Sequence, residues 1–222
     1  MVLEEIISNQ FEIAKQRFPK LHQLISVGDH WDIIGAIDVI DDQGTLWDTY
    51  EVKIVIPKNY PEELFELQET GNKIPKDPNW HNGQSCCVST DATIYSTLGD
   101  DLSLLNWLVK FAHPFLANHI VKKETGKYAG GEFPHNIEGT IVGYEKLFDL
   151  QGALMVFKKL KILCSVLYLG RNNKCFCGSG LKFKKCYLKS PFTHKFSGIP
   201  YSLLQKDLEE ISLSLKRRKL LS

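Results

Sequence analysis

The 222-residue chain is 43% hydrophobic and 24% charged, which suits one domain of ordinary size with a small appendage and excludes a disordered protein. It contains no apolar run of about 20 residues that would span a bilayer. Its first residues, MVLEEIISNQFEIAKQRF, are charged and amphipathic, unlike a secretory signal peptide. We therefore expect a cytoplasmic protein without membrane contact.

The formal net charge of +1 conceals two regions of opposite charge. Residues 1–149 carry 12 Lys/Arg and 23 Asp/Glu, whereas the remaining 73 residues carry 15 and 3, with no acidic residue between Asp149 and Asp207. This break predicts two functional regions. The basic region is suited to an acidic partner surface or nucleic acid, although it can equally complement the acidic region of the same chain.

The first elements along the chain follow clear hydrophobic periodicities. Residues 3–18 place apolar side chains near one face, which predicts an amphipathic helix that ends before a proline. Two alternating stretches, 31–40 and 45–57, flank an Asp-Asp-Gln-Gly turn and predict a β-hairpin. A third extended stretch, 64–69, follows Asn-Tyr-Pro.

The middle of the chain is predicted to begin with a long loop. Residues 74–97 contain several Pro, Asn and Gly residues together with two adjacent cysteines. Helical spacing returns over 102–120, and a further helix is predicted from about 139 to 150. This order of elements predicts an α+β fold with an antiparallel meander flanked by helices.

The chain has six cysteines, and in the absence of a secretory signal they favour catalysis or metal binding over disulfides. Cys164 lies alone in the apolar run ILCSVLYL and is interpreted as a small buried hydrophobe. The others form two groups: Cys86 with Cys87, and Cys175, Cys177 and Cys186.

The run VKIVIPKNYP at 52–61, together with 113–126 and 134–144, carries a resemblance that extends over about residues 1–150. The first run is similar to a strand and Tyr-Pro turn of ubiquitin-conjugating enzymes, and the other two are similar to bacterial members of that family. The family places an Asn eight residues before its active cysteine, and Asn79 stands eight residues before Cys87. The resemblance implies a ubiquitin-conjugating-enzyme-like fold.

The resemblance also implies a mechanism. Cys87 is expected to carry an acyl group as a thioester, because a thiolate accepts and releases acyl groups readily at neutral pH. Asn79 is expected to stabilise the oxyanion, or to organise the group that does. His81 is expected to relay a proton or to orient the loop.

The choice of nucleophile leaves one alternative. The family usually has a glycine three residues before the cysteine, and Gly83 would then select Cys86. The Asn79 spacing and the apolar-Cys-apolar pattern select Cys87, which we prefer. Asp77 stands where the family has His. The chain also lacks a nucleotide-binding fingerprint, so an activated acyl donor must come from another protein.

The segment RNNKCFCGSGLKFKKC at 171–186 resembles the SEC-C zinc motif. The resemblance implies one structural zinc ion with Cys175, Cys177 and Cys186 as ligands. Tyr187 occupies the position of the family's fourth ligand, so His194 is the nearest replacement, with water as an alternative. Reduced cysteines without a metal are the competing interpretation.

These resemblances together predict a domain plan and a pathway. We expect a ubiquitin-conjugating-enzyme-like catalytic domain over 1–150, a connecting helix over 151–169, a SEC-C-like zinc module over 170–195 and a C-terminal helix over 196–222. Bacterial proteins of this kind resemble the stand-alone conjugating enzymes of CBASS antiphage operons, which implies a cGAS-like nucleotidyltransferase as protein partner. The alternatives are an inactive binding module that recruits a partner through the basic zinc tail, and an enzyme serving a dedicated ubiquitin-like modifier.

Overall fold

A computed structural model of the chain describes residues 3–168, 172–174, 180–185 and 198–221. The chain divides into two compact units. The first comprises Met1–Ser89 and Asp101–Glu132, and the second comprises Thr90–Asp100 and Phe133–Ser222. The backbone therefore leaves the first unit directly after the cysteine loop, returns to it, and leaves it again after Glu132.

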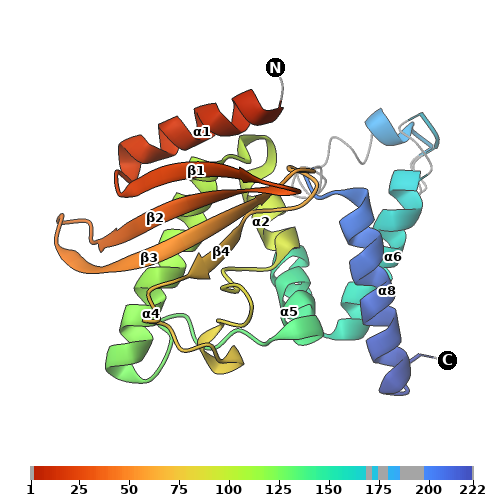
Figure 1. Ribbon diagram of the computed structural model, residues 1–222. Helices are drawn as coiled ribbons and strands as arrows, with labels where there is room; N and C mark the ends of the chain where they lie inside the picture. The colour runs from red at the N-terminus through yellow and green to blue at the C-terminus, as the bar shows by residue number, and fades with distance from the viewer. Residues whose placement is uncertain (1–2, 169–171, 175–179, 186–197, 222) are drawn as a thin grey trace. The chain divides into compact units, whose positions relative to one another are not determined.

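The first unit is built on a four-stranded antiparallel sheet in the order β1-β2-β3-β4 (Figure 1). Its strands are β1 (Leu21–Val27), β2 (His30–Ile40), β3 (Leu46–Pro57) and β4 (Glu66–Glu69). Every second residue of β2 is buried, so the hydrophobic effect fixes which face of the sheet turns inward. The apolar residues that β2 and β3 bury are Trp31, Ile33, Ile37, Val39, Tyr50, Val52, Ile54 and Ile56. The predicted hairpin is confirmed.

Two helical segments cover this sheet. Helix α1 (Leu3–Arg17) buries Ile7, Phe11 and Ala14 and contacts β1, which confirms the predicted N-terminal helix. Helix α4 (His113–Thr125) crosses one face of the sheet against β2 and β3 (Figure 1). It follows α3 (Leu104–Trp107) and a π-helical segment, η3 (Leu108–Ala112).

The second unit is helical in the residues that the structure describes. Its helices are α2 (Asp91–Leu98), α5 (Asn136–Phe148), α6 (Ala153–Tyr168) and α8 (Tyr201–Arg217). Helices α6 and α8 lie side by side (Figure 1). Helix α5 approaches the start of α2 closely at Gly143, where an added Cβ would lie 2.8 Å from the Thr90 hydroxyl oxygen. No helix in the described ranges is long and apolar enough to cross a membrane.

The sequence-based prediction of an α+β fold with an antiparallel meander is confirmed, but two elements were missed. Strand β1 buries only Leu21 fully, so it lacks the alternation that marks a strand. The prediction of a loop over 74–97 was wrong for its last part, where α2 begins. Thr90 caps this helix by accepting a hydrogen bond from the Thr93 amide, and α2 packs against α5. The packing of α2 against α5 and the strength of the Thr90 cap cannot be read from the local sequence pattern.

A buried polar pair joins two helices of the second unit. The hydroxyl of Tyr144 in α5 donates a 2.6 Å hydrogen bond to Oδ2 of Asp207 in α8, and both side chains are buried. Burial raises the pKa of Asp207 to about 6, although the bond from Tyr144 opposes this shift, and the charges of Glu210 and Asp91 add to it. The same burial raises the pKa of Tyr144, so its hydroxyl remains a donor.

We predict that this pair makes stability depend on pH. The folded pKa of Asp207 exceeds its unfolded value. The contribution of Asp207 to the free energy of unfolding is therefore fully present below the unfolded pKa and is lost as pH rises through about 6. Between about pH 4 and about pH 8, the free energy of unfolding of the parent should fall relative to that of Asp207→Asn. This relative fall should be on the order of 2–3 kcal/mol. Urea unfolding at each pH measures this difference. Equal pH dependence in both proteins would contradict the prediction.

Candidate functional site

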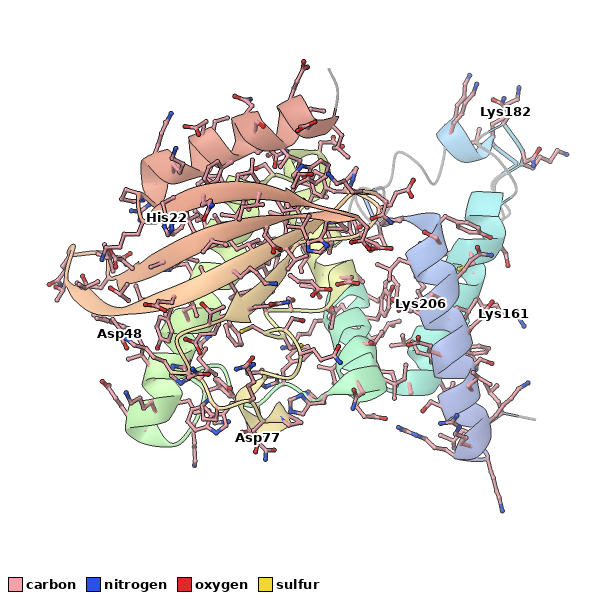
Figure 2. The ribbon with its side chains drawn as sticks, in the orientation of Figure 1. His22, Asp48, Asp77, Lys161, Lys182 and Lys206 are labelled. Carbon is pink, nitrogen blue, oxygen red and sulfur yellow. The ribbon has the colours of Figure 1, made fainter. Side chains whose placement is uncertain are left out.

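A short turn carries the predicted oxyanion residue. The 3₁₀ turn η1 (Pro78–Trp80) is capped by Asp77, whose Oδ1 accepts a 2.7 Å hydrogen bond from the Asn79 amide. Asp77 is labelled in Figure 2. Pro78 suits the first position of such a turn because its missing N–H needs no partner. The turn ends at His81, which adopts a left-handed conformation with φ of 51°. An aspartate therefore gives this turn a cap, where the family that the sequence resembles has histidine.

The two adjacent cysteines differ in their surroundings. The Cys86 amide donates a 2.7 Å hydrogen bond to the Leu67 carbonyl of β4, and the Cys86 side chain is only 5% exposed. Its thiol lies 3.7 Å from Oδ1 of Asn82, which is also buried. The Cys87 amide instead donates a 2.7 Å hydrogen bond to the His81 carbonyl, and its side chain is exposed. The loop thus buries one sulfur and presents the other.

A buried lysine of α4, Lys122, contacts the turn that carries Asn79. The Lys122 ammonium donates a hydrogen bond to the Asn79 carbonyl and lies 3.2 Å from a carboxylate oxygen of Glu132. It also lies 4.8 Å from the ring centre of Trp80 and 4.2 Å from that of Tyr128, within cation–π range. Lys122 is only 7% exposed. These contacts tie the segment after α4 to the turn that carries Asn79.

Aromatic contacts complete the support of the turn. The rings of His81 and Tyr128 meet edge to face with centroids 5.2 Å apart. The ring centroids of Trp80 and His119 lie 5.4 Å apart, and Nδ1 of His119 lies 2.6 Å from the Tyr50 hydroxyl. Burial, with a smaller effect of nearby lysines, lowers the pKa of His119. The imidazole is therefore neutral at physiological pH and adds no second cation beside Lys122.

Electrostatics separate the two candidate nucleophiles. Burial raises the pKa of the Cys86 thiol to about 12, and the negative charge of Glu69 adds to this effect. Only about 10⁻⁴ of Cys86 would then be thiolate near pH 8, and the thiolate is the reactive form. Cys87 is exposed and has no comparable burial. The geometry therefore favours Cys87 as the reactive sulfur.

The structure brings most of the sequence-predicted residues together. Asn79 and His81 lie on the same turn, and the His81 carbonyl binds the Cys87 amide. Sequence reasoning missed three neighbours: Asn82, Lys122 and Tyr128. Lys122 stands in the charged run VKKE, which is typical of a solvated helix face, and its burial comes from tertiary contacts alone.

The predicted zinc ligands Cys175, Cys177, Cys186 and His194 lie outside the described residues. Nearby, a β-bridge pairs Lys174 with Lys182, and the 3₁₀ turn η4 (Phe183–Lys185) follows. The described residues contain no group of three or more His, Cys, Asp or Glu side chains that could hold a metal ion.

Comparison with known proteins identifies one segment. Residues 171–186 match the SEC-C motif, which confirms that part of the sequence-based resemblance. No curated protein and no solved structure matches the chain. The match covers a small part of the chain and lies outside the unit that carries Cys87.

We predict that iodoacetamide modifies Cys87 of the native protein well before Cys86, because only Cys87 is exposed and burial keeps Cys86 protonated. Peptide mapping by mass spectrometry at about pH 8 follows each site. Buried Cys164 is the internal control and should also react slowly. In denaturant the two adjacent cysteines should react at similar rates. Equal rates of modification at Cys86 and Cys87 in the native protein would refute the prediction that Cys87 is the more reactive cysteine.

Proposed function

We propose that the chain is a ubiquitin-conjugating-enzyme-like cysteine acyl carrier. The observation that carries this proposal is the placement of an exposed Cys87 on a loop bound through its amide to the turn of Asn79, while neighbouring Cys86 is buried. An N-terminal helix, an antiparallel meander and a following cysteine loop are also the order of elements that the sequence resemblance implies.

The proposed reaction has two acyl transfers. The Cys87 thiolate attacks the activated C-terminal carbonyl of a partner protein, a C–S bond forms, and the leaving group departs. An amine then attacks the thioester, and its C–N bond replaces the C–S bond. Each attack converts the carbonyl oxygen to an oxyanion, which the Asn79 side chain is suited to stabilise. The activated carboxyl group comes from another protein.

The proposed biological role is bacterial antiphage defence. The support is the resemblance of the sequence to stand-alone conjugating enzymes of CBASS operons, together with the SEC-C motif at residues 171–186. The acyl donor in this proposal is the C-terminus of a cGAS-like nucleotidyltransferase, and the attachment controls second-messenger synthesis.

We expect the protein purified with its neighbouring gene products to carry an adduct on Cys87 that added thiol releases, because the thiol displaces the cysteine from a thioester by acyl exchange. Cys87→Ala should abolish the adduct, and Cys86→Ala is the matched control that should retain it. Intact-mass spectrometry identifies the attached protein. A ubiquitin-like adduct would indicate the modifier pathway instead. No adduct in the parent would favour a non-catalytic binding module.

We also propose that the SEC-C segment binds one structural zinc ion through Cys175, Cys177, Cys186 and His194. Three cysteines and a histidine are a donor set that tetrahedral zinc prefers. A β-bridge pairs Lys174 with Lys182, and Cys175 and Cys177 lie between these two residues in the sequence. The ion would order this short segment, and the chemistry at Cys87 would not involve it.

Elemental analysis of protein prepared without chelator should therefore find one zinc ion per chain. Cys177→Ser should lose the metal, and Cys164→Ser should keep it because Cys164 belongs to helix α6. His194→Ala should retain less zinc than Tyr187→Phe. A parent protein without stoichiometric zinc would refute the proposal, and full retention in His194→Ala would remove His194 from the ligand set.

A further inference from the structure

The hydroxyl of Tyr128 is a buried polar group without a hydrogen-bond partner among the described residues. Tyr128 is 9% exposed, and its hydroxyl oxygen makes no hydrogen bond to any residue that the structure describes. Burying a hydroxyl without a partner costs stability, and phenylalanine in its place would avoid that cost. Such a group in a folded protein needs an explanation, and a catalytic role is one that unsatisfied buried groups have.

Tyr128 lies within the site that holds the nucleophile. Its ring packs against His81, whose carbonyl binds the Cys87 amide, and the Lys122 ammonium lies 4.2 Å from its ring centre. The Tyr128 ring is thus fixed against the residue that binds the Cys87 amide.

We propose that Tyr128 is a catalytic residue that donates its hydroxyl hydrogen bond to the carbonyl oxygen of the acyl group under attack by Cys87. This inference rests on the proposed function. When the thiolate attacks, a C–S bond forms and the carbonyl electron pair moves to oxygen, so the oxyanion becomes a stronger acceptor. When the intermediate collapses, the C=O bond is restored and the leaving group departs with its electron pair. The hydroxyl keeps its proton throughout.

The protonation of Tyr128 suits this role. Burial, and then the charge of Glu132, raises the pKa of Tyr128 to about 12. The hydroxyl is therefore a donor over the whole neutral range. The acyl oxygen would complete the bond in the substrate complex, because catalytic hydrogen bonds often tighten only there. Asn79 and Tyr128 would then be two donors to one oxyanion.

The test compares acylation with alkylation in the full-length protein. Reaction with p-nitrophenyl acetate passes through an oxyanion, whereas reaction with iodoacetamide does not. Tyr128→Phe keeps the ring against His81 and Lys122 and removes only the hydroxyl. We expect the part of the p-nitrophenolate burst that depends on Cys87 to slow by roughly 10²-fold, as when one oxyanion donor is removed elsewhere. Iodoacetamide labelling of Cys87 should be unchanged, and the melting temperature should not fall.

Tyr60→Phe is the matched control. Tyr60 is also a buried tyrosine of the first unit, but its hydroxyl donates a 2.6 Å hydrogen bond to the Leu102 carbonyl. This variant should therefore lose stability and keep the parental burst rate. An unchanged burst in Tyr128→Phe, with the burst lost in Cys87→Ala, would overturn the role of Tyr128 and leave the proposed function standing. A burst that persists fully in Cys87→Ala would overturn the proposed function itself.

Discussion

The burial of one ammonium group constrains the whole cysteine site. A charge removed from water costs several kcal/mol unless neighbouring groups replace its hydration. At Lys122 the replacements are the Asn79 carbonyl, the Glu132 carboxylate and the faces of Trp80 and Tyr128. Through these contacts the ammonium holds the turn before the cysteines against the segment after α4. The position of Cys87 depends on that turn through the His81 carbonyl.

The contrast between the adjacent cysteines follows from their backbone partners. Cys86 pairs with Leu67 and so extends the edge of the sheet at β4, where its side chain enters the core. Its neighbour pairs with His81 and faces solvent. In extended chain, successive side chains point to opposite sides, so one buried cysteine favours exposure of the next. The buried thiol resembles a small apolar side chain, and the exposed one has the access that acyl transfer requires.

The sequence predicted those elements whose own residues carry the signal. Alternation in β2 and β3 and the apolar stripe of α1 arise from burial on one face, and the structure has these elements within a few residues of the prediction. Helix α2 could not be predicted in this way because packing against α5 stabilises it. The same holds for the site. The spacing of Asn79 and Cys87 is a local pattern, whereas the burial of Lys122 and Tyr128 arises from contacts between distant parts of the chain.

The path of the backbone links Cys87 to the second unit. Helix α2 begins at Asp91, a few residues after Cys87, and its buried side chains Ala92, Ile94, Tyr95 and Leu98 belong to the second unit together with α5. A fragment that stops after Glu132 would keep α2 but lose the helix that covers it. That fragment would expose the apolar surface of α2 and would be prone to aggregation. The cysteine unit is therefore not separable by a single cut, and studies of its chemistry need the helices that follow it.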